Sequence, residues 1–169
     1  AERCIGNRVS EMSWDRAKAY LQTFGMDARM IAFDVSSATV ALAAQAIGCR
    51  EGEIAKTLSF LIGDGPILIV AAGDCKIDNA KYKSQFAAKA KMIPFDQVEA
   101  RIGHAVGGVC PFGVEDGVSV YLDASLRRFD AVYPACGSSN SAIRLTIEEL
   151  ERVSGYRRWI DVCKIVGGE

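Results

Sequence analysis

The sequence has few of the residues from which metal and nucleophilic sites are usually built. It contains one histidine, His104, and its six cysteines lie far apart without a Cys-x-x-Cys pair. This spacing argues against zinc, and a single histidine excludes most mixed Cys/His sites. No apolar run approaches the ~20 residues that a membrane-spanning helix requires. We therefore expect no metal or other cofactor, no membrane partner, and reduced thiols in the cytoplasm.

An excess of charge of one sign is also missing. The chain has 20 basic and 21 acidic residues and a net charge of −1, so no overall field attracts nucleic acid, and we expect no DNA partner. Residues 76–91 are a local exception, with five lysines and one aspartate. The segment fits a solvated helix face, and phosphate contact is the second interpretation.

Length and composition favour one globular domain. The chain has 169 residues, of which 50% are hydrophobic and 24% charged, enough for one substantial core. Residues 1–11 are interpreted as an N-terminal arm or an expression remnant, and residues 12–169 as the domain.

Hydrophobic periodicity predicts a mixed α/β fold. Several strands follow one another without a crossover helix, which favours a mixed, largely antiparallel sheet or partial barrel flanked by helices. The clearest signal is a hairpin of residues 54–62 and 67–71. Helices are predicted from Ser13 as N-cap to Gly25, from Ser37 or Thr39 to Gly48, over 79–90, from Asp96 to Gly103, and from Thr146 to Val153. Further strands are predicted at 29–34, 118–122, 129–133, 142–145 and 159–163.

The most unusual stretch is the glycine loop, residues 103–113, with the sequence GHAVGGVCPFG. Glycine tolerates positive φ and allows a ligand to approach the backbone closely. Exposed N–H groups of such a loop can bind an anion or a polarised carbonyl. A β-turn with a bulge is the simpler alternative. The density of glycine, histidine, cysteine and proline favours a binding loop.

Lys56 is the second informative position. Strand alternation places it in phase with the bulky apolar residues Ile54, Leu58 and Phe60, which directs its side chain toward the core side. A buried lysine needs a partner or an open cavity. Two interpretations stay open: a lysine at a binding site, or one whose ammonium reaches water at the strand end.

Three other polar residues could take part in chemistry. His104 and Cys110 could form a thiol-hydrolase pair, although a bracing histidine beside a packed cysteine explains the pattern more simply. Asn140, in GSSNSAI, fits a turn residue better than a substrate-binding amide.

Taken together, these segments resemble a known family, the YbaK/ProX-type aminoacyl-tRNA editing domains, related to the insertion domain of bacterial prolyl-tRNA synthetase. The resemblance covers about residues 36–150. It is carried, in order, by VALAAQAIG, IAKTLSFLI, GHAVGGVCPFG, VSVYLDASL and ACGSSNSAIRLTIEEL.

The resemblance implies hydrolysis of the ester that links a wrong amino acid to the 3′-terminal adenosine of a tRNA, in trans. A water would attack with help from a substrate ribose hydroxyl, without a protein nucleophile or metal. Lys56 would hold the tRNA end. His104 is counted with the substrate-binding residues, and we expect it to support the loop rather than to transfer a proton. The remaining implied residues are the backbone of the loop at the ester carbonyl (Gly107, Gly108, Val109, Cys110, Pro111) and a segment near the pocket (Gly137, Ser138, Asn140).

The implied partners are the aminoacyl-adenosine end of a mischarged tRNA and, where one delivers the substrate, an aminoacyl-tRNA synthetase. Two other functions are kept as alternatives. One is a module that binds a tRNA end or nucleotide without turnover, and the other is a hydrolase using Cys110 and His104.

Overall fold

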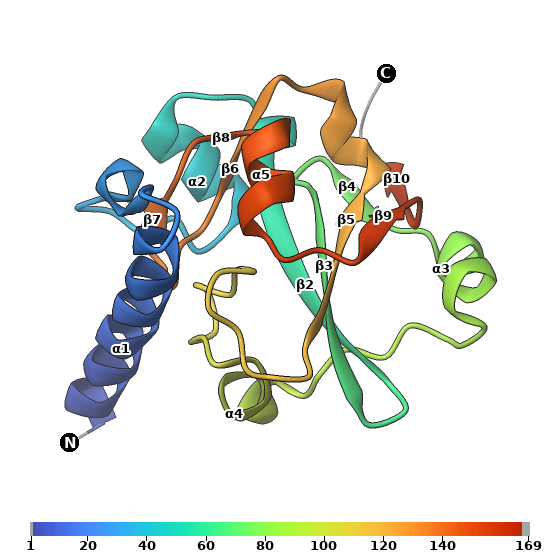
Figure 1. Ribbon diagram of the computed structural model, residues 1–169, viewed down its shortest axis with the longest axis horizontal. Helices are drawn as coiled ribbons and strands as arrows, with labels where there is room; N and C mark the ends of the chain where they lie inside the picture. Colours follow the sequence, from blue (N-terminus) through green and yellow to red (C-terminus); the bar gives the residue numbers. More distant parts are fainter. Residues whose placement is uncertain (1, 167–169) are drawn as a thin grey trace.

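The computed structural model describes residues 2–166, with the backbone alone for residues 2–11. Helices surround a twisted sheet: in the view of Figure 1, α1 and α2 lie to its left and α3 lies to its right. The α-helices of the described chain are α1 (Glu2–Gln22), α2 (Val40–Ile47), α3 (Asn79–Phe86), α4 (Val98–Ile102) and α5 (Ile147–Val153).

The strands form one six-stranded sheet, in the order β8-β6-β2-β3-β5-β9, and two small antiparallel pairs, β1 with β7 and β4 with β10. Their bounds are β1 (Ile31–Ala32), β2 (Ile54–Ile62), β3 (Gly65–Ala72), β4 (Cys75–Ile77), β5 (Ser119–Asp123), β6 (Ala131–Pro134), β7 (Ser141–Ala142), β8 (Leu145–Thr146), β9 (Arg158–Ile160) and β10 (Cys163–Ile165).

The expected mixed α/β fold, with helices around a mixed sheet, is confirmed. The expectation that the sheet would be largely antiparallel does not hold for the six-stranded sheet. Within the six-stranded sheet the pairings β2–β6, β3–β5 and β5–β9 are parallel, and only β2–β3 and β6–β8 are antiparallel. Parallel neighbours arise because long connections carry the chain between β3 and β5 and between β5 and β9.

Local signals placed several elements correctly. Thr39 caps α2 by accepting a hydrogen bond from the Leu42 N–H, and Gly48 ends that helix in the left-handed conformation. Thr146 and Glu149 form the predicted capping box of α5. The β2–β3 hairpin also forms as expected.

Other predicted boundaries were wrong. Ser13 does not cap α1, because the helix begins at Glu2 and its backbone passes through residues 2–11. The expected Asp96–Glu99 capping box does not form, since α4 begins after Gln97 without a side-chain cap. The strand predicted at 159–163 is divided into β9 and β10.

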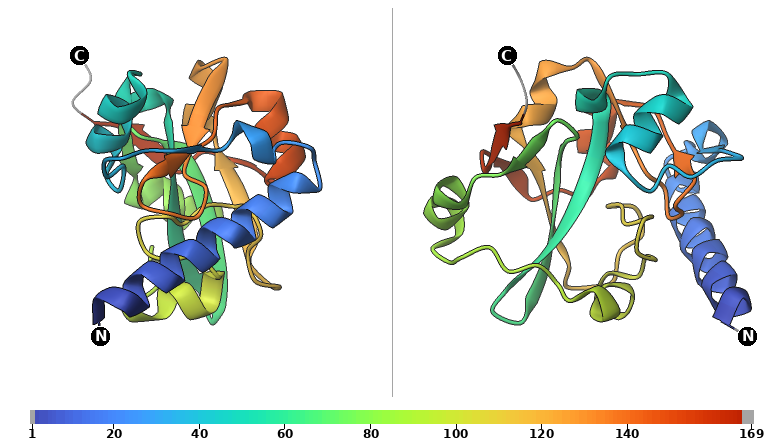
Figure 2. Two further views of the ribbon diagram at one scale, coloured as in Figure 1. Left: turned by 90° about the vertical axis from the view of Figure 1, so that its left-hand side faces the viewer. Right: turned by 180° about the vertical axis from the view of Figure 1, so that it is seen from behind.

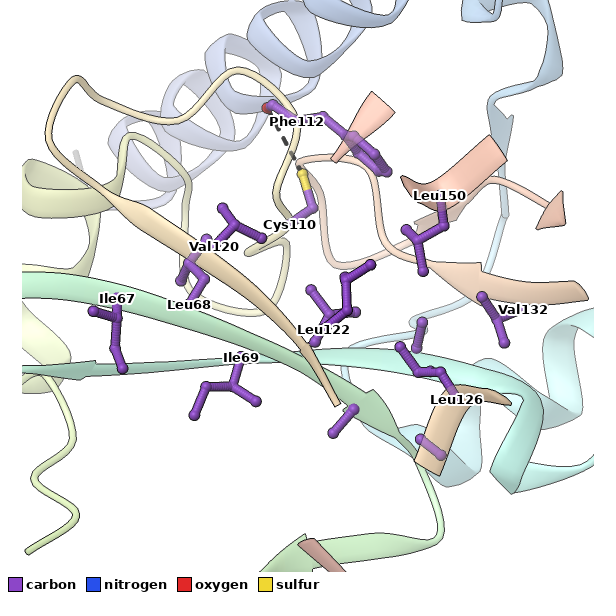
Figure 3. Packing of buried hydrophobic residues seen from close by; sticks show 14 of the residues in the cluster. Ile67, Leu68, Ile69, Cys110, Phe112, Val120, Leu122, Leu126, Val132 and Leu150 are labelled. Carbon is purple, nitrogen blue, oxygen red and sulfur yellow. Dashed lines mark hydrogen bonds between the residues drawn. The ribbon is translucent and has the colours of Figure 1, made fainter. Parts of the chain in front are cut away.

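The core lies on both faces of β3, whose residues 67–72 are buried. Figure 3 shows Leu68, Val120 and Leu122 packed near Cys110 and Phe112 of the glycine loop. The loop is therefore anchored in the main core rather than resting on the surface.

Strand β2 has an open edge, and this positions the site. Its pairing with β6 is limited to Ile54 and Ala55. Farther along, the Leu61 N–H donates to the Lys91 carbonyl (2.8 Å) and the Ile93 N–H to the Ser59 carbonyl (3.1 Å). In the described part of the chain no strand pairs with residues 56–58 on this side. A gap therefore opens between β6 and residues 91–93.

No helix in the described chain is both long and apolar enough to cross a membrane.

Candidate functional site

A cavity of about 640 Å³ lies along the open edge of β2. It brings together segments that are far apart in the sequence: the residues before and within α2, β2, the connection from β4 to α4, the glycine loop, and the ends of β6 and β7. Its lining includes Ser37, Thr39, Val40, Ala43, Lys56, Thr57, Met92, Phe95, Val106, Gly107, Val109, Tyr133 and Ala142. Apart from Lys56, these side chains are small, hydroxylated or apolar.

Lys56 lines this cavity, as expected for a lysine at a binding site. Its side chain is half-buried, and its ammonium donates a hydrogen bond to the Cys75 carbonyl of β4. An ammonium carries three N–H donors, so two remain available. No carboxylate of the described chain forms an ion pair with Lys56. A lysine without an ion-pair partner in the described chain is thus among the residues that line the cavity.

The glycine loop contributes backbone donors. Gly107 and Val109 line the cavity. The Gly108 N–H is already used, donating to the Ala105 carbonyl at 3.0 Å. Within residues 2–166, the N–H groups of Gly107, Val109 and Cys110 donate to no backbone carbonyl. Because only Gly107 and Val109 of these three residues line the cavity, their N–H groups are the loop donors that a ligand there could engage.

The loop keeps its place through a close approach of three backbones. A Cβ on Gly108 would lie 2.4 Å from the Gly137 carbonyl carbon, and one on Gly137 would lie 2.3 Å from the Ser13 carbonyl oxygen of α1. The Gly137 N–H donates to the Gly108 carbonyl at 3.1 Å. Side chains at either position would push the layers apart, which explains the need for glycine.

His104 fastens the same loop to α1. Its Nε2 lies 2.6 Å from the Phe112 carbonyl and its Nδ1 lies 2.8 Å from the Ser13 hydroxyl oxygen. A carbonyl only accepts, so Nε2 carries the proton and Nδ1 accepts from the Ser13 O–H. The same hydroxyl accepts from the Ala105 N–H at 3.1 Å. His104 is fully buried, and burial lowers its pKa from the usual 6.5 to about 4. It is a neutral loop support.

Cys110 is poorly suited to act as a nucleophile. Its sulfur lies 3.6 Å from His104 Nε2, but that nitrogen donates its proton to Phe112. The thiol is fully buried, and burial raises its pKa well above the usual value. A neutral thiol without a free base beside it does not favour the thiol-hydrolase alternative.

The other predicted site residues support the cavity from outside. Cys110, Pro111, Gly108, Gly137, Ser138 and Asn140 do not line it. Asn140 donates from Nδ2 to the Phe33 carbonyl (2.8 Å) and accepts at Oδ1 from the Ser138 hydroxyl (2.9 Å). Its amide therefore joins the turn before β7 to the segment after β1. The catalytic and binding roles given to these residues remain predictions.

Sequence reasoning missed much of the cavity wall. Thr39, Tyr133 and Phe95 line it, although each lies in a segment whose pattern predicted only secondary structure. The exposed aromatic ring of Phe95 follows Pro94 at the start of a short 3₁₀ turn, and no periodic signal distinguishes it. Among the described residues, no group of three or more His, Cys, Asp or Glu side chains could hold a metal ion.

The lowered pKa of His104 predicts a loss of stability on acidification. Between pH 6.5 and 4 the unfolded chain binds a proton at this position and the folded chain does not. Unfolding should therefore become easier by up to about 3 kcal/mol as the pH falls through this window. Urea denaturation at several pH values checks this. The His104→Gln variant should show a flatter pH dependence, and equal slopes for the two proteins would contradict the assignment.

Because Gly108 lies so close to the Gly137 backbone, we predict that adding even a methyl group at this position lowers the stability of the protein. Gly108→Ala should lower the free energy of unfolding by about 1–3 kcal/mol, as overpacking against backbone does. Gly65→Ala is the matched control, because Gly65 also lacks a positive φ and meets only the Ile62 carbonyl at 3.3 Å. Denaturant unfolding of both variants measures this difference. Similar losses of unfolding free energy in the two variants would refute a specific constraint at Gly108.

Comparisons with known proteins agree with this architecture. The family model described as "Aminoacyl-tRNA editing domain" matches residues 35–153. Bacillus subtilis YwhH, an uncharacterized protein, is 49% identical over 154 residues, 90% of this chain and 98% of that protein. Enterococcus faecalis EbsC, proposed to be a Cys-tRNA(Pro)/Cys-tRNA(Cys) deacylase, is 28% identical over 110 residues, 63% of this chain and 66% of its own length.

A solved structure shows the same arrangement. The crystal structure of a proposed trans-editing enzyme for prolyl-tRNA synthetase superposes with a TM-score of 0.81 at 28% identity, covering 90% of this chain and 97% of that one. The match of the editing-domain model spans most of the chain, including β2, the glycine loop and the turn at Gly137. The chain belongs to the aminoacyl-tRNA editing domain family.

Proposed function

We propose that this protein is a deacylase that hydrolyses the ester of mischarged tRNA in trans, in the cytoplasm. One observation carries the proposal. An uncompensated lysine and the glycine loop, with unused backbone N–H groups, line one cavity of a size suited to a small ligand. Family membership supports tRNA as the substrate class.

The proposed reaction needs no protein nucleophile. A water attacks the ester carbonyl, and the carbonyl oxygen becomes an oxyanion that the N–H groups of Gly107 and Val109 stabilise. A ribose hydroxyl of the substrate orients the water and takes part in its proton transfer. The tetrahedral intermediate then expels the ribose oxygen, which takes up the proton, and the amino acid leaves as a carboxylic acid.

Lys56 is proposed to hold the tRNA end through a phosphate. Its bond to the Cys75 carbonyl fixes the ammonium and leaves two donors for phosphate oxygens. A charge-assisted hydrogen bond of this kind is stronger than a neutral one. Holding the 3′ end positions the ester against the loop, and such positioning accelerates an already reactive ester.

Delivery of the substrate is a separate question. The chain is nearly neutral overall, so we propose weak, salt-sensitive binding of free tRNA and a synthetase as the partner that delivers it.

The mechanism predicts that Lys56 matters and the Cys110 thiol does not. Lys56→Ala should lower kcat/KM by about 10–100-fold, which corresponds to losing one charge-assisted hydrogen bond of roughly 1.5–3 kcal/mol. Cys110→Ala, in protein that still folds, should stay within a few-fold of wild type. The measurement is deacylation of a panel of mischarged tRNAs that includes Ala-tRNA(Pro) and Cys-tRNA(Pro).

Three outcomes would overturn parts of this proposal. Full activity of Lys56→Ala would remove the lysine from the mechanism. Loss of activity in Cys110→Ala, with Lys56→Ala unaffected, would favour the thiol hydrolase. Binding of tRNA ends without hydrolysis of any member of the panel would identify a non-catalytic binding module.

Salt dependence tests the lysine-rich segment 76–91. Lys89 and Lys91 are exposed, and neither takes part in a salt bridge of the described chain. Lys89→Ala/Lys91→Ala should reduce the slope of log K against log salt by on the order of one to two for tRNA binding. Lys18→Ala, an exposed lysine of α1, should leave the slope unchanged. An unaltered slope in the double variant would exclude phosphate contact at this segment.

A further inference from the structure

The rim of the cavity is unusually apolar for an exposed surface. Three of its lining residues leave large parts of their apolar side chains uncovered: Phe95 at 77%, Met92 at 60% and Val106 at 42% exposure. Among residues 12–166, Phe95 is the most exposed large hydrophobic residue. Contiguous apolar surface at the mouth of a cavity marks a place where another molecule binds.

The backbone around Phe95 is fixed although its ring is uncovered. Before it, Ile93 is buried and its N–H donates to the Ser59 carbonyl at 3.1 Å. After it, the Gln97 N–H donates to the Pro94 carbonyl at 2.8 Å, and Val98 is buried. The segment therefore presents the Phe95 ring from a fixed backbone, so little backbone entropy would be lost on binding.

The charges beside the rim select the kind of molecule. Lys89 and Lys91 precede Phe95 on the same segment, and Lys56 lies in the cavity. Asp96 and Glu99 line a separate groove, together with Asp15 and Glu115. An aromatic ring beside lysines suits a ligand with a flat apolar face and negative charges, which is a nucleotide of a single strand.

We propose that the Phe95 ring is the stacking platform for the base of the 3′-terminal nucleotide of the RNA substrate. The inference rests on the proposed function and assigns a residue to substrate recognition. The ester enters the cavity between Lys56 and the glycine loop, while the base stays at the rim against Phe95. Stacking is largely independent of base identity, so this contact holds the end without reading its sequence.

A double-mutant cycle tests the contact. The probes are two uncharged RNA minihelices, one ending in CCA and one whose last nucleotide lacks its base, with affinity measured by fluorescence anisotropy at low salt. Phe95→Ala should weaken binding of the complete RNA roughly 5–100-fold, the range expected for one base–aromatic stack. The same substitution should barely change binding of the abasic RNA.

Two further variants serve as controls. Phe95→Trp should retain wild-type affinity for the complete RNA, because a larger ring still stacks. Val35→Ala removes another side chain that is 60% exposed but lies outside the cavity lining, and it should change neither affinity.

Several results would overturn the inference. One is that Phe95→Ala weakens the binding of both RNAs equally, and another is that it weakens the binding of neither. A third is that the wild-type protein shows no detectable binding of the complete RNA. Each of these three results would contradict the stacking contact. If Phe95→Ala left RNA binding intact but abolished an association with another protein, the rim would be a protein-binding surface instead. Deacylation by wild type with no sensitivity to Phe95 would refute only this inference, whereas Phe95-dependent RNA binding without deacylation would refute only the proposed activity.

Discussion

The close approach of three backbones, from α1, the Gly137 turn and the glycine loop, is the constraint on which the site depends. Gly108 lies against Gly137, and Gly137 lies against the Ser13 carbonyl of α1, each without room for a Cβ. A loop built of glycine would otherwise be flexible, because glycine has the largest backbone entropy to lose. Here the layers on either side hold the loop, so its N–H groups have fixed positions. Preorganised donors stabilise developing charge without a cost of reorganisation during the reaction.

His104 reinforces this arrangement through side-chain hydrogen bonds. The imidazole joins the Phe112 carbonyl to the Ser13 hydroxyl, and Ser13 in turn accepts from the Ala105 N–H. Both ends of the glycine loop are thereby connected to Ser13 of α1. In both views of Figure 2, α1 (blue) lies beside this loop (yellow). This role requires a neutral ring with one donor and one acceptor, and burial keeps the ring neutral. Helix α1 lies outside the residues 35–153 that the family model matches.

The sequence indicated the local elements better than their assembly. Capping at Thr39 and Thr146 and the turn between β2 and β3 follow from neighbouring residues, and such signals can be read directly. The strand phase of Lys56 and the family resemblance both indicated a binding site at this lysine, and Lys56 does line the cavity. The full length of α1 was missed because Ser13 is a good capping residue and so indicated a later start. Its hydroxyl instead bonds to His104, 91 positions away in the sequence. The cavity wall was missed because Thr39, Phe95 and Tyr133 are far apart in the sequence and meet only after the chain has folded.

The division between backbone and side chains explains why the proposed chemistry and the choice of amino acid are separable. In the proposed mechanism the oxyanion is held by N–H groups, which every residue except proline supplies. The glycine positions are therefore constrained by packing, while the apolar side chains that line the cavity take no part in the proposed chemical step. Val40, Ala43 and Tyr133 form one wall of the cavity together with Ile54, and under the proposed function their volumes would limit the amino acid that fits beside the ester. A hydrophobic wall distinguishes side chains mainly by excluding larger ones, since a missing methylene changes binding by only about 1–3 kcal/mol. Substrate choice in this protein should accordingly follow the size of these wall residues rather than any residue of the glycine loop.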